Sequence, residues 1–116
     1  MAEVIVQLWE ESERGWGVRP NGASIHLTEA DRKAYIKAYW DRMPERAPDE
    51  YSRPTSGSVK TTVYDPEKGE FEFRLTTGPM TVSDEVFERV RERIGEGRNG
   101  LRFWKDRAAW ELLQDG

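Results

Sequence analysis

The feature that most constrains the fold is a change in hydrophobic period, from two residues to 3.6, that occurs twice along the chain. A period of two is typical of a half-buried strand, and a period of 3.6 of an amphipathic helix. Each predicted helix starts at a capping residue, Thr28 or Ser83. The pattern predicts an α+β fold, with an antiparallel sheet of about five to six strands and two main helices packed on one face.

The first predicted β/α unit comprises residues 1–43. Residues 3–9 have the pattern of a strand, residues 10–15 that of a polar turn, and residues 16–19 that of a second strand. The sequence Pro20-Asn21-Gly22 predicts another turn before a short third strand at residues 23–27. A helix is expected from residue 28 to about residue 43. Its predicted buried stripe is Ile36, Tyr39, Trp40 and Met43.

The second predicted unit, residues 59–95, follows a proline-rich segment at residues 44–58 that is expected to be a long loop. Residues 58–64 and 70–77 predict a hairpin with its turn at 65–69, and residues 80–82 a short third strand. Ser83 caps the second helix, and Gly95 ends it. Its predicted buried stripe is Val86, Phe87, Val90 and Ile94.

The C-terminal segment, residues 96–116, predicts a strand at 101–104 and a short helix at 108–113 capped by Asp106. Residues 1–116 are expected to form a single domain. The recurrence of strands and then a helix leaves open a pseudo-duplicated architecture of β-hairpin–β–α units, although the two units share a pattern and not residues.

The composition predicts a thin core completed by aromatic residues. Val, Ile, Leu and Phe account for 22 of the 116 residues, and five Trp and four Tyr add apolar bulk. There is no cysteine, which removes disulfides and thiolate sites and suits a reducing compartment, so we expect a cytoplasmic protein. Residues 1–13 carry acids and no apolar run longer than three, so they predict no signal peptide. We also expect no membrane association.

Nothing in the sequence predicts a catalytic residue, a cofactor site or a metal site. The glycines of residues 95–100 match G-x-G-x-x-G, but they follow a predicted helix, whereas a dinucleotide-binding loop follows a strand and opens a helix. The only histidine, His26, has no metal-ligand spacing around it and is expected to be packed on a strand or at the surface. The many carboxylate pairs are explained by solvated turns and helix starts.

One segment has a distinct charge. Residues 89–107 carry a net charge of +4, while the remainder of the chain carries −8. Phe103 and Trp104 lie inside this basic stretch, next to Arg98 and Arg102. Arginine together with aromatic rings is typical both of nucleic-acid stacking surfaces and of protein-interface hot spots. A solvated helix face is the alternative interpretation.

Three further residues are candidate contacts with a partner. Trp16 stands between two glycines in a predicted turn, where an exposed ring could anchor a partner, although it could equally cap the sheet. Tyr51 and Arg53 lie in the proline-rich segment. The candidate partner-binding residues are Trp16, Tyr51, Arg53, Arg98, Arg102 and Trp104.

Part of the chain resembles small uncharacterised proteins of bacteria and their phages. The similarity is carried by residues 15–22 (Gly-Trp-Gly-Val-Arg-Pro-Asn-Gly), 26–28, 39–44 (Tyr-Trp-Asp-Arg-Met-Pro) and 48–54 (Pro-Asp-Glu-Tyr-Ser-Arg-Pro). Phage proteins of this size include many inhibitors of bacterial defence, anti-CRISPR proteins among them. The resemblance therefore implies a binding inhibitor, and it assigns no residue a role.

These observations lead to one main hypothesis and two alternatives. The main hypothesis is a non-catalytic protein that binds a protein or ribonucleoprotein partner, such as a CRISPR-Cas component, and inhibits it. The first alternative is a single-stranded nucleic-acid-binding module that uses the basic aromatic C-terminal segment. The second is a small carboxylate-dependent enzyme, for which no positive signal exists.

Overall fold

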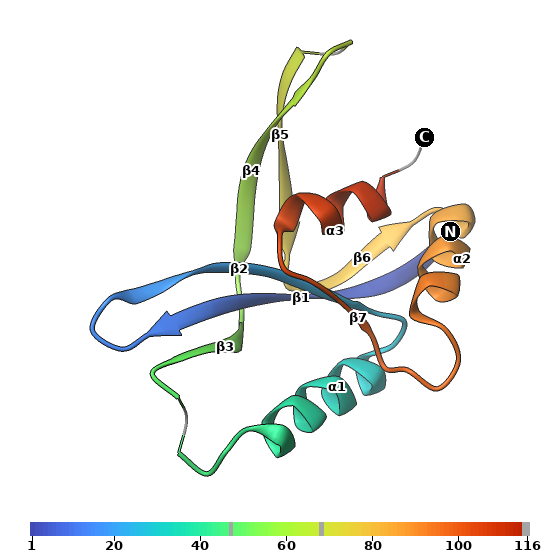
Figure 1. Ribbon diagram of the computed structural model, residues 1–116. Coiled ribbons are helices and arrows are strands. Elements are labelled where there is room, and N and C mark those ends of the chain that lie inside the picture. The colour runs from blue at the N-terminus through green and yellow to red at the C-terminus, as the bar shows by residue number, and fades with distance from the viewer. Residues whose placement is uncertain (47, 68, 115–116) are drawn as a thin grey trace.

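The computed structural model shows a mixed α+β fold built around one long hairpin, and it describes residues 1–46, 48–67 and 69–114 (Figure 1). Strands β1 (Ala2–Glu13) and β2 (Gly17–His26) form an antiparallel hairpin that is paired from Ile5 opposite His26 to Glu13 opposite Gly17. Helix α1 (Glu29–Arg42) follows. The predicted α+β class and antiparallel sheet are confirmed.

Of the two turns predicted inside the first unit, the one at residues 10–15 begins only after residue 13, and the one at residues 20–22 is wrong. The strand continues through residues 10–13, because their acidic side chains are paired with arginines on neighbouring strands: Arg19 with Glu11 and Glu13, and Arg53 with Glu10. Residues 20–22 also stay in the sheet. Leu8 pairs with Ala23 and Glu10 pairs with Pro20, so the register between β1 and β2 shifts by one residue at this point. The residues predicted to form a turn therefore make a β-bulge, and residues 16–27 contain one strand instead of two.

Gly22 fits both the bulge and the neighbouring strand. Its φ of +79° lies in the region that favours glycine. A Cβ at this position would lie 1.9 Å from the carbonyl oxygen of Phe103. The glycine therefore allows β7 (Leu101–Phe103) to approach β2 closely.

The predicted long loop contains an edge strand. Strand β3 (Glu50–Thr55) pairs with the second half of β1, and β6 (Gly78–Val82) pairs with the first half of the same edge. Between them, β4 (Ser58–Asp65) and β5 (Gly69–Thr76) leave the sheet as a two-stranded ribbon, drawn upward in Figure 1. The hairpin predicted at residues 58–77 is confirmed, while Lys68 of its turn lies outside the described residues.

The ribbon is joined to the sheet at its base. The amide of Thr77 donates to the carbonyl of Gly57 at 2.9 Å, and the Thr77 hydroxyl donates to the carbonyl of Thr55 at 2.9 Å. The same hydroxyl accepts from the amide of Leu8 at 3.2 Å. One threonine therefore ties β3, β1 and the foot of the ribbon together.

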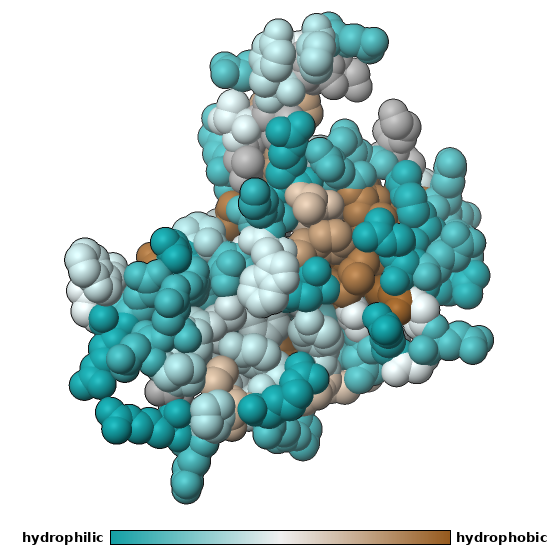
Figure 2. Space-filling model, in the orientation of Figure 1, coloured by the Kyte–Doolittle hydropathy of each residue, from teal (hydrophilic) through white to brown (hydrophobic). Residues whose placement is uncertain are grey.

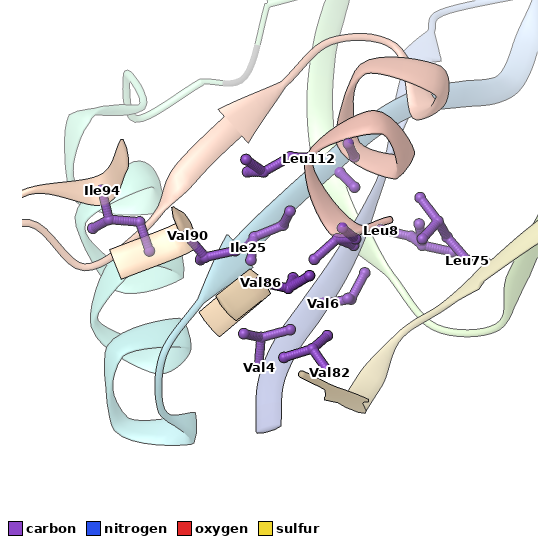
Figure 3. Close-up of a cluster of buried hydrophobic side chains, with 13 residues drawn as sticks. Val4, Val6, Leu8, Ile25, Leu75, Val82, Val86, Val90, Ile94 and Leu112 are labelled. Carbon is purple, nitrogen blue, oxygen red and sulfur yellow. The ribbon is translucent and has the colours of Figure 1, made fainter. Parts of the chain in front are cut away.

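The main core lies on one face of the sheet (Figure 3). Val4, Val6 and Leu8 of β1 meet helices α2 (Asp84–Ile94) and α3 (Asp106–Leu113) there, together with Leu75 from the ribbon. Figure 2 shows the apolar surface gathered beside α3, while the hairpin tip and the outer ribbon are largely hydrophilic. The predicted cap and buried stripe of α2 are confirmed, with Phe87 half-buried.

Helix placement differs from the prediction. Helix α1 lies on the opposite face, against Trp9, so the two main helices do not share a face. It has no fully buried residue, and Trp40 of its predicted stripe is 40 % exposed. The side chains that contact Trp9 are Tyr35, which the prediction missed, and Tyr39, which belongs to the predicted stripe. In α3, Asp106 is the first helical residue, and the N-cap is Lys105 without a side-chain hydrogen bond.

The duplication alternative finds no support in this arrangement. The first unit has two strands before its helix, whereas the second has a protruding ribbon and a separate strand before its helix. The two helices also cover opposite faces of the sheet.

Candidate functional site

Arg102 is the central residue of the candidate site. Strand β7 places it opposite Ser24 of β2, on the face of the sheet that α1 covers. Its guanidinium carbon lies 5.0 Å from the ring centre of Trp9 and 4.3 Å from that of Trp104. The cation is thus held against two indole rings, a geometry that is stabilising where water is partly excluded.

Arg102 forms no ion pair with a carboxylate of the described residues, although the charge of Asp106 raises its pKa by an effect smaller than that of burial. Its Nη1 donates to the carbonyl of Phe103 at 2.6 Å, and its Nη2 donates to the carbonyl of Asn21 at 2.7 Å. It makes no ion pair with any residue in the described part of the chain. Burial lowers the pKa of Arg102 to about 10, which still leaves it protonated at neutral pH. The site therefore holds a partly desolvated positive charge.

Aromatic rings of α1 form the wall opposite Arg102. Tyr39 lies edge-on to Trp9 at 5.0 Å between ring centres, and Tyr35 at 6.2 Å. The Tyr39 hydroxyl donates to the carbonyl of Ser52, which ties the helix to β3. Burial raises the pKa of both phenols, so both stay neutral hydrogen-bonding groups.

A buried chain of hydrogen bonds supports the floor of the site. The Trp9 indole donates to the Ser24 hydroxyl at 2.8 Å, and Ser24 lies 2.7 Å from His26 Nε2. His26 Nδ1 lies 2.7 Å from the carbonyl of Asn99, which can only accept. His26 must therefore carry its proton on Nδ1 and accept from Ser24 on Nε2, so the chain is satisfied with a neutral imidazole. Burial lowers the pKa of His26, in agreement with this assignment.

The same histidine positions the loop between α2 and β7. Gly100 has no side chain, and a Cβ there would lie 2.3 Å from His26 Nδ1. The loop can approach β2 only because this residue is glycine. The bond from His26 to Asn99 then fixes the loop at its closest point, next to Arg98. The predicted helix-ending role of Gly95 is confirmed, while the role of Gly100 comes from packing that the sequence pattern does not reveal.

Two adjoining pockets surround Arg102. The first has a volume of about 330 Å³ and includes Trp9, Tyr39 and Trp104 in its lining. The second has a volume of about 400 Å³ and includes Arg98 and the glycine loop. Both are lined by Tyr35, Arg42 and Arg102, which makes them one continuous surface. We call it the basic aromatic groove and define it by Trp9, Tyr35, Tyr39, Arg42, Arg98, Arg102 and Trp104.

The groove is basic in a chain that is acidic overall. Three arginines line it and no Asp or Glu does, although the chain has 22 acidic residues and a net charge of −4. Arg42 and Arg98 are exposed and, within the described residues, form no ion pair. The groove therefore presents positive charge beside aromatic rings, which suits an anion that carries flat or apolar groups.

The structure brings together half of the predicted contact residues. Arg98, Arg102 and Trp104 all line the groove, and Trp104 is 65 % exposed. Sequence reasoning missed Tyr35, Tyr39 and Arg42, which complete it from α1. Their spacing of four and three residues places them on one helical face, and that spacing is a signal that could have identified them.

The other predicted contact residues lie elsewhere. Tyr51 packs near Trp40, with 6.3 Å between ring centres. Arg53 Nε donates to Glu10 at 2.6 Å and so forms part of the sheet edge. Trp16 is 85 % exposed at the tip of the long hairpin, which agrees with the exposed alternative for this ring.

Two other clusters resemble functional sites without forming one. The carboxylates of Glu11, Glu13 and Glu50 converge, but Arg19 lies 2.8 to 3.8 Å from all three and already pairs with them, which offsets part of their negative charge. The hydrogen-bonded pair of Ser24 and His26 is completely buried, so a substrate has no access to it.

Comparisons with protein-family models, with curated proteins and with solved structures find no match to this chain. In the part of the chain that the structure describes, no helix is both long and apolar enough to cross a membrane.

Proposed function

We propose that this chain is a non-catalytic binding protein whose basic aromatic groove holds an anionic segment of a macromolecular partner. The observation that carries the proposal is the lining of the groove, which contains three arginines and no acid. Arg102 is partly desolvated and has no ion-pair partner among the described residues, so an incoming anion gains more from it than it would from a solvated arginine. Charge-assisted hydrogen bonds are also stronger than neutral ones.

The proposal is tested by binding of simple polyanions to the purified full chain. Heparin, a polyglutamate peptide and a single-stranded oligonucleotide are compared at low salt. We expect at least one to bind, and we expect Arg42→Ala combined with Arg98→Ala to weaken that binding about tenfold or more.

The matched control is Arg74→Ala combined with Arg93→Ala. These arginines are exposed on the ribbon and on α2, so the double variant changes the net charge equally while leaving the groove intact. Equal weakening by both double variants would show that only the overall charge matters. That result, or no binding by any polyanion, would refute the proposal.

The hairpin tip supports a narrower second candidate, an inhibitor of a bacterial defence system such as CRISPR-Cas. The side chain of Trp16 is 85 % exposed at the tip of the β1–β2 hairpin. Exposed tryptophans on rigid hairpins are typical anchors of protein interfaces. The test is phage plating on CRISPR-immune bacteria that produce the wild type or Trp16→Ser. Restored plating that is lost in the variant supports this candidate, whereas plating equal to an empty vector contradicts it for the system used.

A further inference from the structure

We infer that the occupant of the basic aromatic groove is single-stranded nucleic acid, with a base stacked on Trp104 and phosphates bound by Arg42 and Arg98. This inference rests on the proposed function, because it names the chemical class of the anionic partner. It is carried by the position of one exposed tryptophan next to three arginines.

Trp104 provides the stacking surface. It is 65 % exposed, yet its position is set because its ring contacts the Arg102 guanidinium, which in turn is held by two backbone carbonyls. A ring ordered in this way loses little conformational freedom when a ligand binds. A base stacked on an aromatic side chain contributes about 1–3 kcal/mol, and it does so without a requirement for sequence.

The arginines have an arrangement that suits a backbone. Arg42 reaches the groove from the end of α1, and Arg98 reaches it from the α2–β7 loop. Both line the pocket that shares Arg102 with the pocket of Trp104. A strand that follows the groove therefore meets phosphate-binding side chains in one pocket and a stacking ring in the next.

The aromatic component favours a single strand over the other polyanions. A peptide with only acidic side chains would use the arginines but would leave the Trp104 ring without a stacking partner. A duplex buries the faces of its bases against one another, so it cannot offer one to Trp104. Acidic residues elsewhere, such as Glu11 and Glu13 on the hairpin, repel a long polyanion and confine the contact to a few nucleotides.

The test measures fluorescence anisotropy of a labelled oligothymidylate of about ten nucleotides with the full chain. The affinities of the same labelled strand in a duplex and of a labelled polyglutamate are measured separately for comparison. We expect the single strand to bind most tightly, and its log affinity to fall with log salt at a slope of about −1.4, as for two phosphate contacts.

Variants separate stacking from charge. We expect Trp104→Ala to weaken oligothymidylate binding about tenfold and Trp104→Phe to restore most of it. Trp16→Ala, which removes a still more exposed tryptophan outside the groove, should have no effect. The double variant Arg42→Ala with Arg98→Ala should weaken the binding of every anion.

The outcomes distinguish this inference from the proposed function. If polyglutamate or the duplex binds as tightly as the single strand, or if Trp104→Ala behaves like Trp16→Ala, the inference is wrong while the anionic groove remains. If no anion binds, both fail. Circular-dichroism melting of each variant checks that its fold is retained.

Discussion

The proton on His26 illustrates how single residues determine the shape of the groove. Its imidazole is completely buried and bonded on both nitrogens, to Ser24 and to the carbonyl of Asn99. A second proton would make both nitrogens donors, and Ser24, which already accepts from Trp9, would have no acceptor left for its own hydrogen. The neutral form is therefore built into the fold.

This arrangement predicts a loss of stability in mild acid. Burial lowers the pKa of His26 in the folded state below its ordinary value of 6.5, so the unfolded chain binds the proton more tightly. The contribution of neutral His26 to the free energy of unfolding is therefore complete above pH 6.5, and it is lost as the pH falls below 6.5. We expect the melting temperature of the wild type to fall as the pH is lowered below about 6.5.

The control for this prediction is His26→Gln, which has no titrating group at the site. It should be less stable at pH 7.5, because the bonds to Ser24 and Asn99 are perturbed, but its melting temperature should change less over the same pH range. Parallel curves for the two proteins would show that His26 does not cause the effect.

Gly100 offers a second test at this scale. In Gly100→Ala the new methyl group would lie 2.3 Å from His26 Nδ1, so the loop must move away from β2. We expect a loss of roughly 1–3 kcal/mol in the free energy of unfolding, measured with urea. Asn99→Ala keeps the carbonyl that His26 uses and should change stability by less than about 0.5 kcal/mol. Equal effects of the two variants would contradict the packing argument.

Among the elements, the two main helices differ in how they are held. Helix α2 buries Val86, Val90 and Ile94 in the main core, while α1 is attached by half-buried tyrosines on the opposite face. The basic aromatic groove lies along the side of α1 that carries Tyr35, Tyr39 and Arg42. The thin aliphatic content of the chain is thus concentrated on one face of the sheet.

This difference predicts unequal effects of the same substitution. Ile94→Ala removes a side chain that is 3 % exposed and should cost about 2–5 kcal/mol of unfolding free energy. Ile36→Ala removes the same atoms from a half-buried position on α1 and should cost clearly less. Chemical denaturation of both variants provides the comparison. An equal loss would mean that α1 belongs to the same core as α2.

The elements also show which parts of the fold can be read from the sequence. The strands of the ribbon and helix α2 have strong periodicity and clear caps, and both were predicted. The first hairpin was divided wrongly, because Pro20, Asn21 and Gly22 are turn residues by propensity but here form a bulge. The acids of β1 were interpreted as a turn, since their pairing with Arg19 and Arg53 depends on strands distant in sequence.

The groove was predictable only in part for a similar reason. The local charge and aromatic content of residues 98–104 identified Arg98, Arg102 and Trp104. Tyr35, Tyr39 and Arg42 lie some 60 residues earlier, and they reach the site because α1 packs on Trp9, which no local pattern specifies. The predicted stripe of α1, which comprises Ile36, Tyr39, Trp40 and Met43, included Tyr39 but missed Tyr35, because the sequence does not say which face meets the sheet.

At the scale of the whole molecule, strand pairing is uneven. Strand β1 has neighbours on both edges, whereas β4 and β5 pair only with each other in the described part of the structure. We expect the amides of residues 4–8 to exchange with solvent at least about tenfold more slowly than those of residues 70–74. Hydrogen exchange followed by mass spectrometry measures both segments. Equal rates would indicate that the ribbon opens only when the whole chain unfolds.

The pairing of β1 also has a consequence for synthesis of the protein. This strand leaves the ribosome well before some of its partners: Ala2 pairs with Val82, and β2 gains its outer neighbour only when residues 101–103 emerge. At about 5–20 residues per second, the apolar run of β1 waits several seconds for these partners. Nascent or truncated chains that stop before Val82 therefore expose an unpaired, aggregation-prone strand edge, and we expect chaperones at the ribosome exit to bind them.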